Sequence, residues 1–157
     1  MTSIVDFWPQ PETFFHYQAY YLKTTLDIKL NSPVTVIKCK CGGLRLGLVD
    51  IGHADRMQLQ NIEHQVLEKL PIKTNGLQHK FSANDDVIFL NAEHAMVFNQ
   101  DRCKLDIQEL TKTEYCRIII RVLGVKITKE GTASLVARIQ QLLIDEKDSN
   151  DEICLFD

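Results

Sequence analysis

The chain has 157 residues, 45% of them hydrophobic, and a formal net charge of −3. This length predicts one domain or two small lobes around a shared core, and the weak negative charge gives no sign of a nucleic-acid partner. We expect no membrane span, because no apolar run approaches roughly 18 residues, and no signal peptide, because the N-terminus lacks a basic start before an apolar run. From residue 145 onward six acids face one lysine, so residues 146–157 are predicted to form an acidic, flexible tail.

Aromatic residues gather at the start of the chain. Residues 3–21 hold seven of the twelve Phe, Tyr and Trp residues. Pro9 and Pro11 interrupt this segment, which predicts two short strands over residues 4–8 and 13–19. The rings fit either the core or an exposed platform for a ligand. We favour the core, because rings at strand spacing usually pack inward.

Short apolar runs with period two predict strands through the first half of the chain. Residues 20–31 fit a short helix passing into a strand, and Gly42-Gly43 marks a hairpin turn. Residues 62–71 are predicted to form a short helix or an ordered loop. The predicted strands cover residues 26–30, 34–40, 44–50, 56–60 and 77–81. Five short antiparallel strands within this length suit a small barrel.

The second half combines further strands with helices. The strongest strand signal lies at residues 115–122, and a turn at residues 129–131 returns the chain to a strand at residues 133–139. Residues 101–110 and the last turn at residues 140–146 are predicted to be helical.

The sequence offers no catalytic or metal-binding constellation. The five cysteines form no C-x-x-C pair, and no histidine lies at a metal-ligand interval from them, so we expect reduced thiols in an intracellular protein. No Ser/His/Asp or Cys/His grouping is apparent, and the predicted strands lack the clustered acids of a metal-dependent nuclease. We therefore expect no enzyme activity, no cofactor and no metal.

The segment from Leu48 to Ile62 has the sequence Leu-Val-Asp-Ile-Gly-His-Ala-Asp-Arg-Met-Gln-Leu-Gln-Asn-Ile, and Leu70-Pro71 follows it. This resembles the hairpin of Tudor domains, aromatic-Val-Asp-Tyr-Gly-Asn-x-Glu-x-Val-x-Leu-x-x-Leu, then Leu-Pro. The matching positions include Asp50, Gly52 and Asp55. Ile51 replaces the family's Tyr, His53 its Asn and Leu48 its aromatic residue, and the Trp-Tyr-Arg-Ala phrase of a Tudor second strand is absent. Upstream, residues 10–18 loosely match the Ser-Pro-x-x-Phe-Tyr-x-Gln phrase of extended Tudor domains.

The resemblance to extended Tudor domains implies a mostly β fold with a few helices. In that family a five-stranded Tudor barrel, here residues 26–81, is inserted into a staphylococcal-nuclease-like lobe of the OB type, here residues 1–25 and 82–145. The single module would therefore span residues 1–145. The implied function is a non-catalytic adaptor in the piRNA pathway, with germline granules in the cytoplasm or around the nucleus (nuage) as its location.

The implied partner is the Arg/Gly-rich tail of a PIWI-type Argonaute, with self-association as an addition and neither nucleic acid nor membrane expected. No aromatic residue lies between Tyr21 and Phe81, so the aromatic cage is incomplete and we expect no selection for dimethylarginine. Unmethylated arginine could pair with carboxylates instead. The predicted peptide site consists of Leu48, Asp50, Ile51, His53 and Asp55.

A different class of function stays open. Arg117 and Arg121 lie four apart on the strongest strand, so they share one face, and Lys126 and Lys129 follow. This spacing fits either a solvated outer face or a basic stripe for nucleic acid. The alternative hypothesis is therefore an OB-type module that binds single-stranded nucleic acid or scaffolds a nucleoprotein complex.

Overall fold

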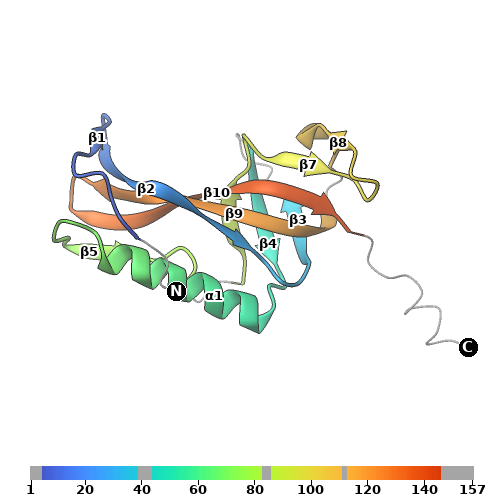
Figure 1. Ribbon diagram of the computed structural model, residues 1–157, viewed down its shortest axis with the longest axis horizontal. Helices are drawn as coiled ribbons and strands as arrows, with labels where there is room; N and C mark the ends of the chain where they lie inside the picture. The colour runs from blue at the N-terminus through green and yellow to red at the C-terminus, as the bar shows by residue number, and fades with distance from the viewer. Residues whose placement is uncertain (1–4, 39–43, 83–85, 111–112, 146–157) are drawn as a thin grey trace, which may run out of the picture.

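The computed structural model describes residues 5–38, 44–82, 86–110 and 113–145 (Figure 1). The predicted acidic tail, residues 146–157, lies outside this part of the chain. In chain order the elements are β1 (Glu12–Thr13), β2 (Tyr17–Lys29), β3 (Val34–Lys38), β4 (Arg45–Val49), α1 (His53–Glu68), β5 (Gly76–Gln78), β6 (Ile88–Asn91), β7 (Met96–Phe98), β8 (Lys104–Leu105), the 3-10 helix η1 (Ile107–Glu109), β9 (Thr113–Thr128) and β10 (Thr132–Ile144).

Five of these strands close into a barrel. The ring runs β9–β3–β4–β6–β10 and returns to β9, with β6 and β10 parallel and the other neighbours antiparallel. The predicted fold class, mostly β with few helices and a five-stranded barrel, is confirmed. The membership of the barrel differs from the prediction, because only the strands near residues 34–40 and 44–50 belong to it. The other three places are taken by β6, β9 and β10.

Strand β2 extends the barrel sheet beyond the ring. It pairs with β9 along most of its length, from Tyr17 opposite Thr128 to Lys29 opposite Ile119, with a bulge between Tyr21 and Leu26. The short helix expected within residues 20–31 is therefore wrong, because the backbone hydrogen bonds of this segment go to β9. The strand also runs without a break through residue 25, so segments assigned to the two predicted lobes share one sheet.

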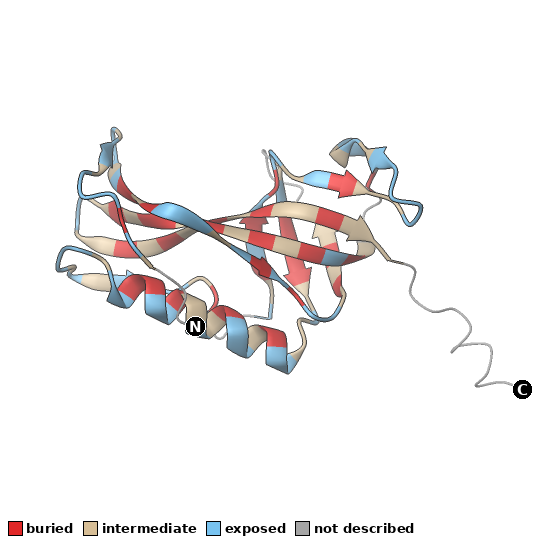
Figure 2. Ribbon diagram, viewed as in Figure 1, coloured by how far each residue is buried: buried red, intermediate tan, exposed pale blue. Residues whose placement is uncertain are grey.

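Helix α1 replaces the second strand of the predicted hairpin. Residues 56–60 lie within this helix, which covers one face of the long sheet (Figure 1). Leu59, Val66 and Leu67 are buried at helical spacing against the strands, whereas Met57 is 46% exposed. Figure 2 shows buried and exposed positions alternating along this helix. The alternation of Met57 and Leu59 that predicted a strand therefore places the two side chains on different faces of a helix.

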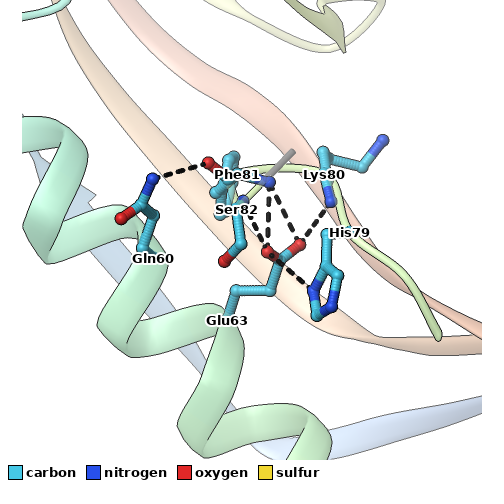
Figure 3. Close-up of polar contacts among 6 residues, drawn as sticks. All are labelled: Gln60, Glu63, His79, Lys80, Phe81 and Ser82. Atoms are coloured by element: carbon cyan, nitrogen blue, oxygen red, sulfur yellow. Dashed lines mark hydrogen bonds and ion pairs between the residues drawn. The ribbon is translucent and has the colours of Figure 1, made fainter. Parts of the chain in front are cut away.

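A buried carboxylate fixes the chain that follows α1. Glu63, fully buried, accepts backbone hydrogen bonds from Lys80 at 2.5 Å, Phe81 at 3.1 Å and Ser82 at 2.8 Å (Figure 3). The Nδ1 atom of His79 lies 3.6 Å from the same carboxylate. A buried charge is tolerated where several donors surround it. Glu63 thus holds the segment after β5 against the helix, and β5 ends at Gln78 instead of the predicted residue 81.

Three other predicted elements are corrected. The helix expected at residues 101–110 is replaced by β8 and the single turn η1, and the helical turn at residues 140–146 is replaced by the end of β10, which pairs with β7 and β9 through Leu143. In the N-terminal segment, the predicted strand at residues 13–19 is divided between the two-residue β1 and the start of β2. Residues 5–8, the described part of the other predicted strand, make one isolated bridge, from Phe7 to Leu22. The strong strand at residues 115–122 and its return strand are confirmed within β9 and β10.

Candidate functional site

Five strands each bring one polar residue to a single line across the outer face of the sheet. The strand register pairs Arg45 with Asn91, Asn91 with Arg138, Arg138 with Arg121, and Arg121 with Asp27. Cross-strand partners point to the same face, and successive residues point to opposite faces. On each strand a residue directly beside the polar one in sequence is buried: Leu46, Leu90, Ile139, Ile120 and Ile28. The five polar residues, termed here the arginine row, therefore face outward.

The charges of the row are only partly balanced. Arg121 holds Asp27 in a two-pronged pair, with Nε–Oδ1 at 2.7 Å and Nη2–Oδ2 at 3.0 Å. The hydrogen bond from Arg121 lowers the pKa of Asp27, burial opposes this shift, and the charges of Arg121 and Arg138 reinforce it. Within the described part of the chain, neither Arg45 nor Arg138 makes a salt bridge, and the buried Nε of Arg138 lacks a hydrogen-bond partner. The row thus keeps two uncompensated guanidinium groups.

An aromatic ring lies beside the row. Phe89 on β6 is 38% exposed, and the guanidinium carbon of Arg45 lies 5.7 Å from its ring centroid. The ring packs over Gly47, where an added Cβ would meet Phe89 Cε1 at 3.1 Å and side-chain atoms of Ile37 and Val87 at 2.9 Å. The absence of a side chain at Gly47 therefore lets these apolar groups lie close to the strand. They form a low platform next to an arginine.

Two lysines, Lys80 and Lys126, lie near one end of the long ribbon that β9 and β10 form. The pKa of Lys80 is lowered, first by burial and then by the positive charges of Arg45 and Lys126. The register places both lysines at this end of the sheet, because Lys80 follows β5, whose Gln78 pairs with Ser134, and Ser134 pairs with Lys126. Lys126 in turn lies 5.3 Å from the centroid of the Tyr17 ring.

The end of the ribbon carries three rings at least partly open to solvent, two of them close to a lysine. We use the term aromatic end for Phe14, Phe15, Tyr17, Lys126 and Lys129. The rings of Phe14 and Tyr17 stack with centroids 4.6 Å apart, Lys129 Nζ lies 5.3 Å from the Phe15 centroid, and Phe15 is 80% exposed. The expectation that the N-terminal rings pack in the core is right for Phe7 and Tyr20, but wrong for Phe15 and for Trp8, which is 54% exposed.

A pocket of about 600 Å³ lies at the opposite end of the ribbon, beneath the turn that joins β7 to β8. Its floor is the outer face of β2, β9 and β10, and its charged lining consists of Lys29, Arg102, Arg117 and Asp145. Arg117 Nε lies 3.3 Å from Asp145 Oδ2. The pocket therefore has a surplus of positive charge.

The five residues of the predicted peptide site differ in their exposure. Leu48 and Asp55 are buried, and the Asp55 carboxylate accepts backbone hydrogen bonds from residues 31 and 32 at 2.8 Å and 3.0 Å, so neither residue is open to a ligand. Asp50 is exposed at a φ of 58°, a conformation that aspartate tolerates. Asp50 and Ile51 line a second pocket of about 580 Å³, and His53 is exposed at the start of α1.

Of the residues in the arginine row, only Arg121 was predicted from the sequence as a candidate for binding. Arg117 and Arg121 do share a strand and its outer face, but each is paired with a carboxylate. Arg45, Asn91 and Arg138 were not recognised. Arg45 and Arg138 do interrupt apolar runs with an outward-facing cation, which was the available signal. What joins them is the pairing of distant strands, which a single sequence does not reveal.

Several other chemistries have no basis in the residues that the structure describes. These residues contain no group of three or more His, Cys, Asp and Glu side chains placed to hold a metal ion. Of the cysteines within the described ranges, Cys103 is exposed and Cys116 is buried, and burial raises the pKa of the Cys116 thiol to about 12. A thiol with that pKa stays protonated and is a poor nucleophile. Within the same ranges, no helix is both long and apolar enough to cross a membrane.

The fold resembles that of a phage single-stranded DNA-binding protein. The single-stranded DNA-binding protein from bacteriophage Enc34 matches with a TM-score of 0.52 and 16% identity, over 94% of this chain and 99% of that chain. The same protein in complex with ssDNA matches with a TM-score of 0.51 and 15% identity, over 94% and 98%, and its C-terminal truncation with 0.52 and 16%, over 90% and 96%. No family model matches the sequence, and a search of curated proteins finds no match. At this identity the similarity shows the fold alone, a small OB-like β-barrel.

These findings correct the predicted function. The Argonaute-tail adaptor, with its germline and piRNA setting, is wrong, because the structural neighbours are single-stranded DNA-binding proteins and none is a Tudor protein. The expectation that nucleic acid is not a partner is overturned by the same neighbours. The physical reason for the error is α1: the hairpin frame on which the resemblance rested is a strand followed by a helix.

Proposed function

We propose that this chain is a non-catalytic OB-type module that binds single-stranded nucleic acid, primarily DNA, across its arginine row. The observation that carries the proposal is the register that aligns Arg45, Arg138 and Arg121 on one outward line. Neighbouring strands are about 4.8 Å apart, so the line places guanidinium groups at closely spaced positions. Guanidinium groups bind phosphate through paired hydrogen bonds. The row therefore suits a backbone that crosses the strands.

Exposed rings supply the second half of this chemistry. Proteins that bind single strands without sequence preference combine a basic groove with aromatic side chains on which bases stack. Phe89 offers such a ring beside the row, and Phe15 offers one at the aromatic end. Each ring has a cation beside it that could contact the phosphate next to a stacked base. The overall charge of −3 does not oppose this function, because Arg45, Arg121 and Arg138 share one face of the sheet.

The small barrel is coarsely compatible with the fold of an extended Tudor domain. This compatibility gives no reason to propose a second function. Helix α1 occupies the place of the second strand of the predicted hairpin, and Leu48 and Asp55 of the predicted peptide site are buried. The alternative hypothesis from the sequence, an OB-type module for single strands, is the one that the arginine row and the structural neighbours support.

The proposal is tested by removing the two uncompensated cations of the row. The variants Arg45→Gln and Arg138→Gln keep a polar side chain of similar length, and Lys69→Gln at the exposed end of α1 removes the same charge away from the row. We expect the wild-type chain to bind oligo-dT of 20 nucleotides, and each arginine variant to bind about tenfold more weakly, since hydrogen bonds to charged groups are worth about 1.5–3 kcal/mol. The slope of log K against log salt should fall by about 0.7 for each lost phosphate contact.

Fluorescence anisotropy at several salt concentrations measures both quantities. Lys69→Gln should reproduce the wild-type affinity and slope. A wild-type chain that does not bind the oligonucleotide at low salt, or arginine variants that match Lys69→Gln, would show that the row is no nucleic-acid interface. Circular dichroism of each variant checks that the barrel is intact.

A further inference from the structure

The pocket beneath the β7–β8 turn has the size and lining of a small-molecule site. Its volume of about 600 Å³ lies within the range of roughly 300–1,000 Å³ found for ligand pockets. Cations reach it from three separate elements: Lys29 from β2, Arg117 from β9 and Arg102 from the β7–β8 turn. The one acid in the lining, Asp145, is paired with Arg117. Lys29 and Arg102 make no salt bridge to any residue that the structure describes, so they are open to an anion.

The turn that presents Arg102 is built in a costly conformation. Arg102 has a φ of 65°, in the left-handed region where a side chain is unfavourable and glycine is usual. Asn99 holds the turn in place, because its side-chain oxygen accepts from the backbone N–H groups of Asp101 and Cys103, both at 2.9 Å. The Arg102 N–H also donates to the Asn99 carbonyl at 2.9 Å. An arginine kept where glycine would relieve strain indicates that its side chain has a function.

The remaining lining fits a base and sugar. Phe98, Ile119 and Leu143 provide apolar surface, and the amides of Gln100 and Gln141 provide donors and acceptors at its margin. Amide side chains form paired hydrogen bonds with base edges, and apolar surface accepts the face of a base. The pocket thus combines cations with apolar surface and side-chain amides, a combination that matches a phosphorylated nucleotide better than phosphate alone.

We propose that this pocket binds one nucleotide through its phosphomonoester, with Lys29 and Arg102 on the phosphate. The shared ligand chemistry is a nucleoside monophosphate, presented either at the phosphorylated end of a strand or as a free nucleotide. The inference rests on the proposed function only for the first source, in which a strand lying across the arginine row ends in the pocket. A free nucleotide would bind whether or not the row binds DNA.

The position of Arg102 allows an unusually clean variant. Arg102→Gly removes the side chain and supplies the residue that the backbone conformation favours, so the fold should be retained or strengthened. Lys29→Gln removes the second cation from an exposed strand position. Lys104→Gln on β8 is the matched control, because it removes a cation from the same hairpin but does not line the pocket.

Isothermal titration of the full chain with dAMP, deoxyadenosine and inorganic phosphate tests the pocket directly. We expect dAMP to bind more tightly than either fragment, Arg102→Gly and Lys29→Gln to weaken it at least fivefold, and Lys104→Gln to stay within twofold. Oligo-dT with a 5′-phosphate, a 3′-phosphate or hydroxyl ends then separates the sources. A gain of fivefold or more from one phosphorylated end, lost in Arg102→Gly, identifies a strand end, and dAMP binding without an end effect identifies a free nucleotide.

The two proposals fail separately. If dAMP does not bind and phosphorylated ends give no gain while hydroxyl-ended oligo-dT still depends on Arg45 and Arg138, the pocket inference is wrong and the row stands. If dAMP binds equally well to Arg102→Gly and to the wild-type chain, the pocket inference is also wrong. If hydroxyl-ended oligo-dT does not bind at all, the proposed function is wrong, whatever the result with dAMP.

Discussion

Replacing Asp27 tests whether the arginine row binds nucleic acid or only stabilises the fold. Asp27 neutralises Arg121 at one end of the row, so Asp27→Asn should free a guanidinium for phosphate. We expect the variant to bind oligo-dT several-fold more tightly, with a salt slope steeper by about 0.7. Glu68→Gln, an exposed position on α1, makes the same change in net charge and should leave the affinity unaltered. A weaker complex for Asp27→Asn would mean that Asp27 orients Arg121 for binding and does not compete with phosphate.

The same substitution has a predictable effect on stability. Because the pKa of Asp27 is lowered in the folded chain, its ion pair stabilises the fold above the unfolded pKa of about 3.9. This contribution is lost as the pH falls through the lower, folded pKa. The pair is partly exposed, so Asp27→Asn should cost only about 0.2–1 kcal/mol at pH 7. Urea unfolding at pH 7 should show the difference, and at a pH below the folded pKa the two chains should unfold alike.

At the scale of elements, the close pairing of β2 with β9 depends on Gly124. A Cβ at this position would collide with the Tyr20 carbonyl oxygen and approach Tyr21 Cα to 2.9 Å. These are backbone atoms that cannot move aside without breaking the strand pairing, so Gly124→Ala should cost at least about 2–3 kcal/mol. Gly76→Ala, where no heavy atom lies within 4 Å of the added Cβ, should change stability by less than about 0.5 kcal/mol. Denaturant midpoints at unchanged m-value measure both.

The pattern of burial explains which elements could be predicted from the sequence. The segments with strict alternation, Val34 and Val36 in β3 or Ile118 and Ile120 in β9, were recognised because one face is buried and the other is not. Only the second half of helix α1 was anticipated, as a short helix or ordered loop over residues 62–71, because two of the buried positions of the helix are acids. Asp55 binds the turn after β2, and Glu63 binds the backbone after β5. Both partners are distant in sequence, so a helical stripe interrupted by carboxylates looked polar.

At the scale of the molecule, the missing information was which strands are neighbours. The sequence predicted a barrel, and a barrel exists, but its ring closes through pairings between β4 and β6 and between β6 and β10. The arginine row is a product of those pairings, since Arg45 and Arg138 are far apart in the chain. Composition concealed it as well, because a net charge of −3 averages over a basic face and acidic segments elsewhere. The function was therefore misjudged from a short local resemblance.

The length of the ribbon sets a scale for the ligand. From Arg117 on β9 beside the pocket to Lys129, which directly follows β9 at the aromatic end, the chain spans about twelve residue steps, or about 40 Å at ~3.3 Å per residue. A short oligonucleotide cannot reach both ends. Affinity for oligo-dT should thus rise with length and then level off within the ~4–16 nucleotides that one OB fold covers. Phe15→Ala should leave the affinity of the shortest ligands unchanged and weaken the longer ones about tenfold, as expected for one lost stacking contact of ~1–3 kcal/mol.

The control for this series is Met57→Ala, which truncates an exposed apolar side chain on α1. It should match the wild-type chain at every length. Equal weakening at all lengths by Phe15→Ala would place that ring at the centre of the interface, and no weakening at any length would remove the aromatic end from it. A length-dependent loss, in contrast, requires a strand that runs along the β9–β10 ribbon, because only then do the added nucleotides meet the ring. The same series measured with Arg45→Gln should show a loss at every length, since the row lies between the two ends.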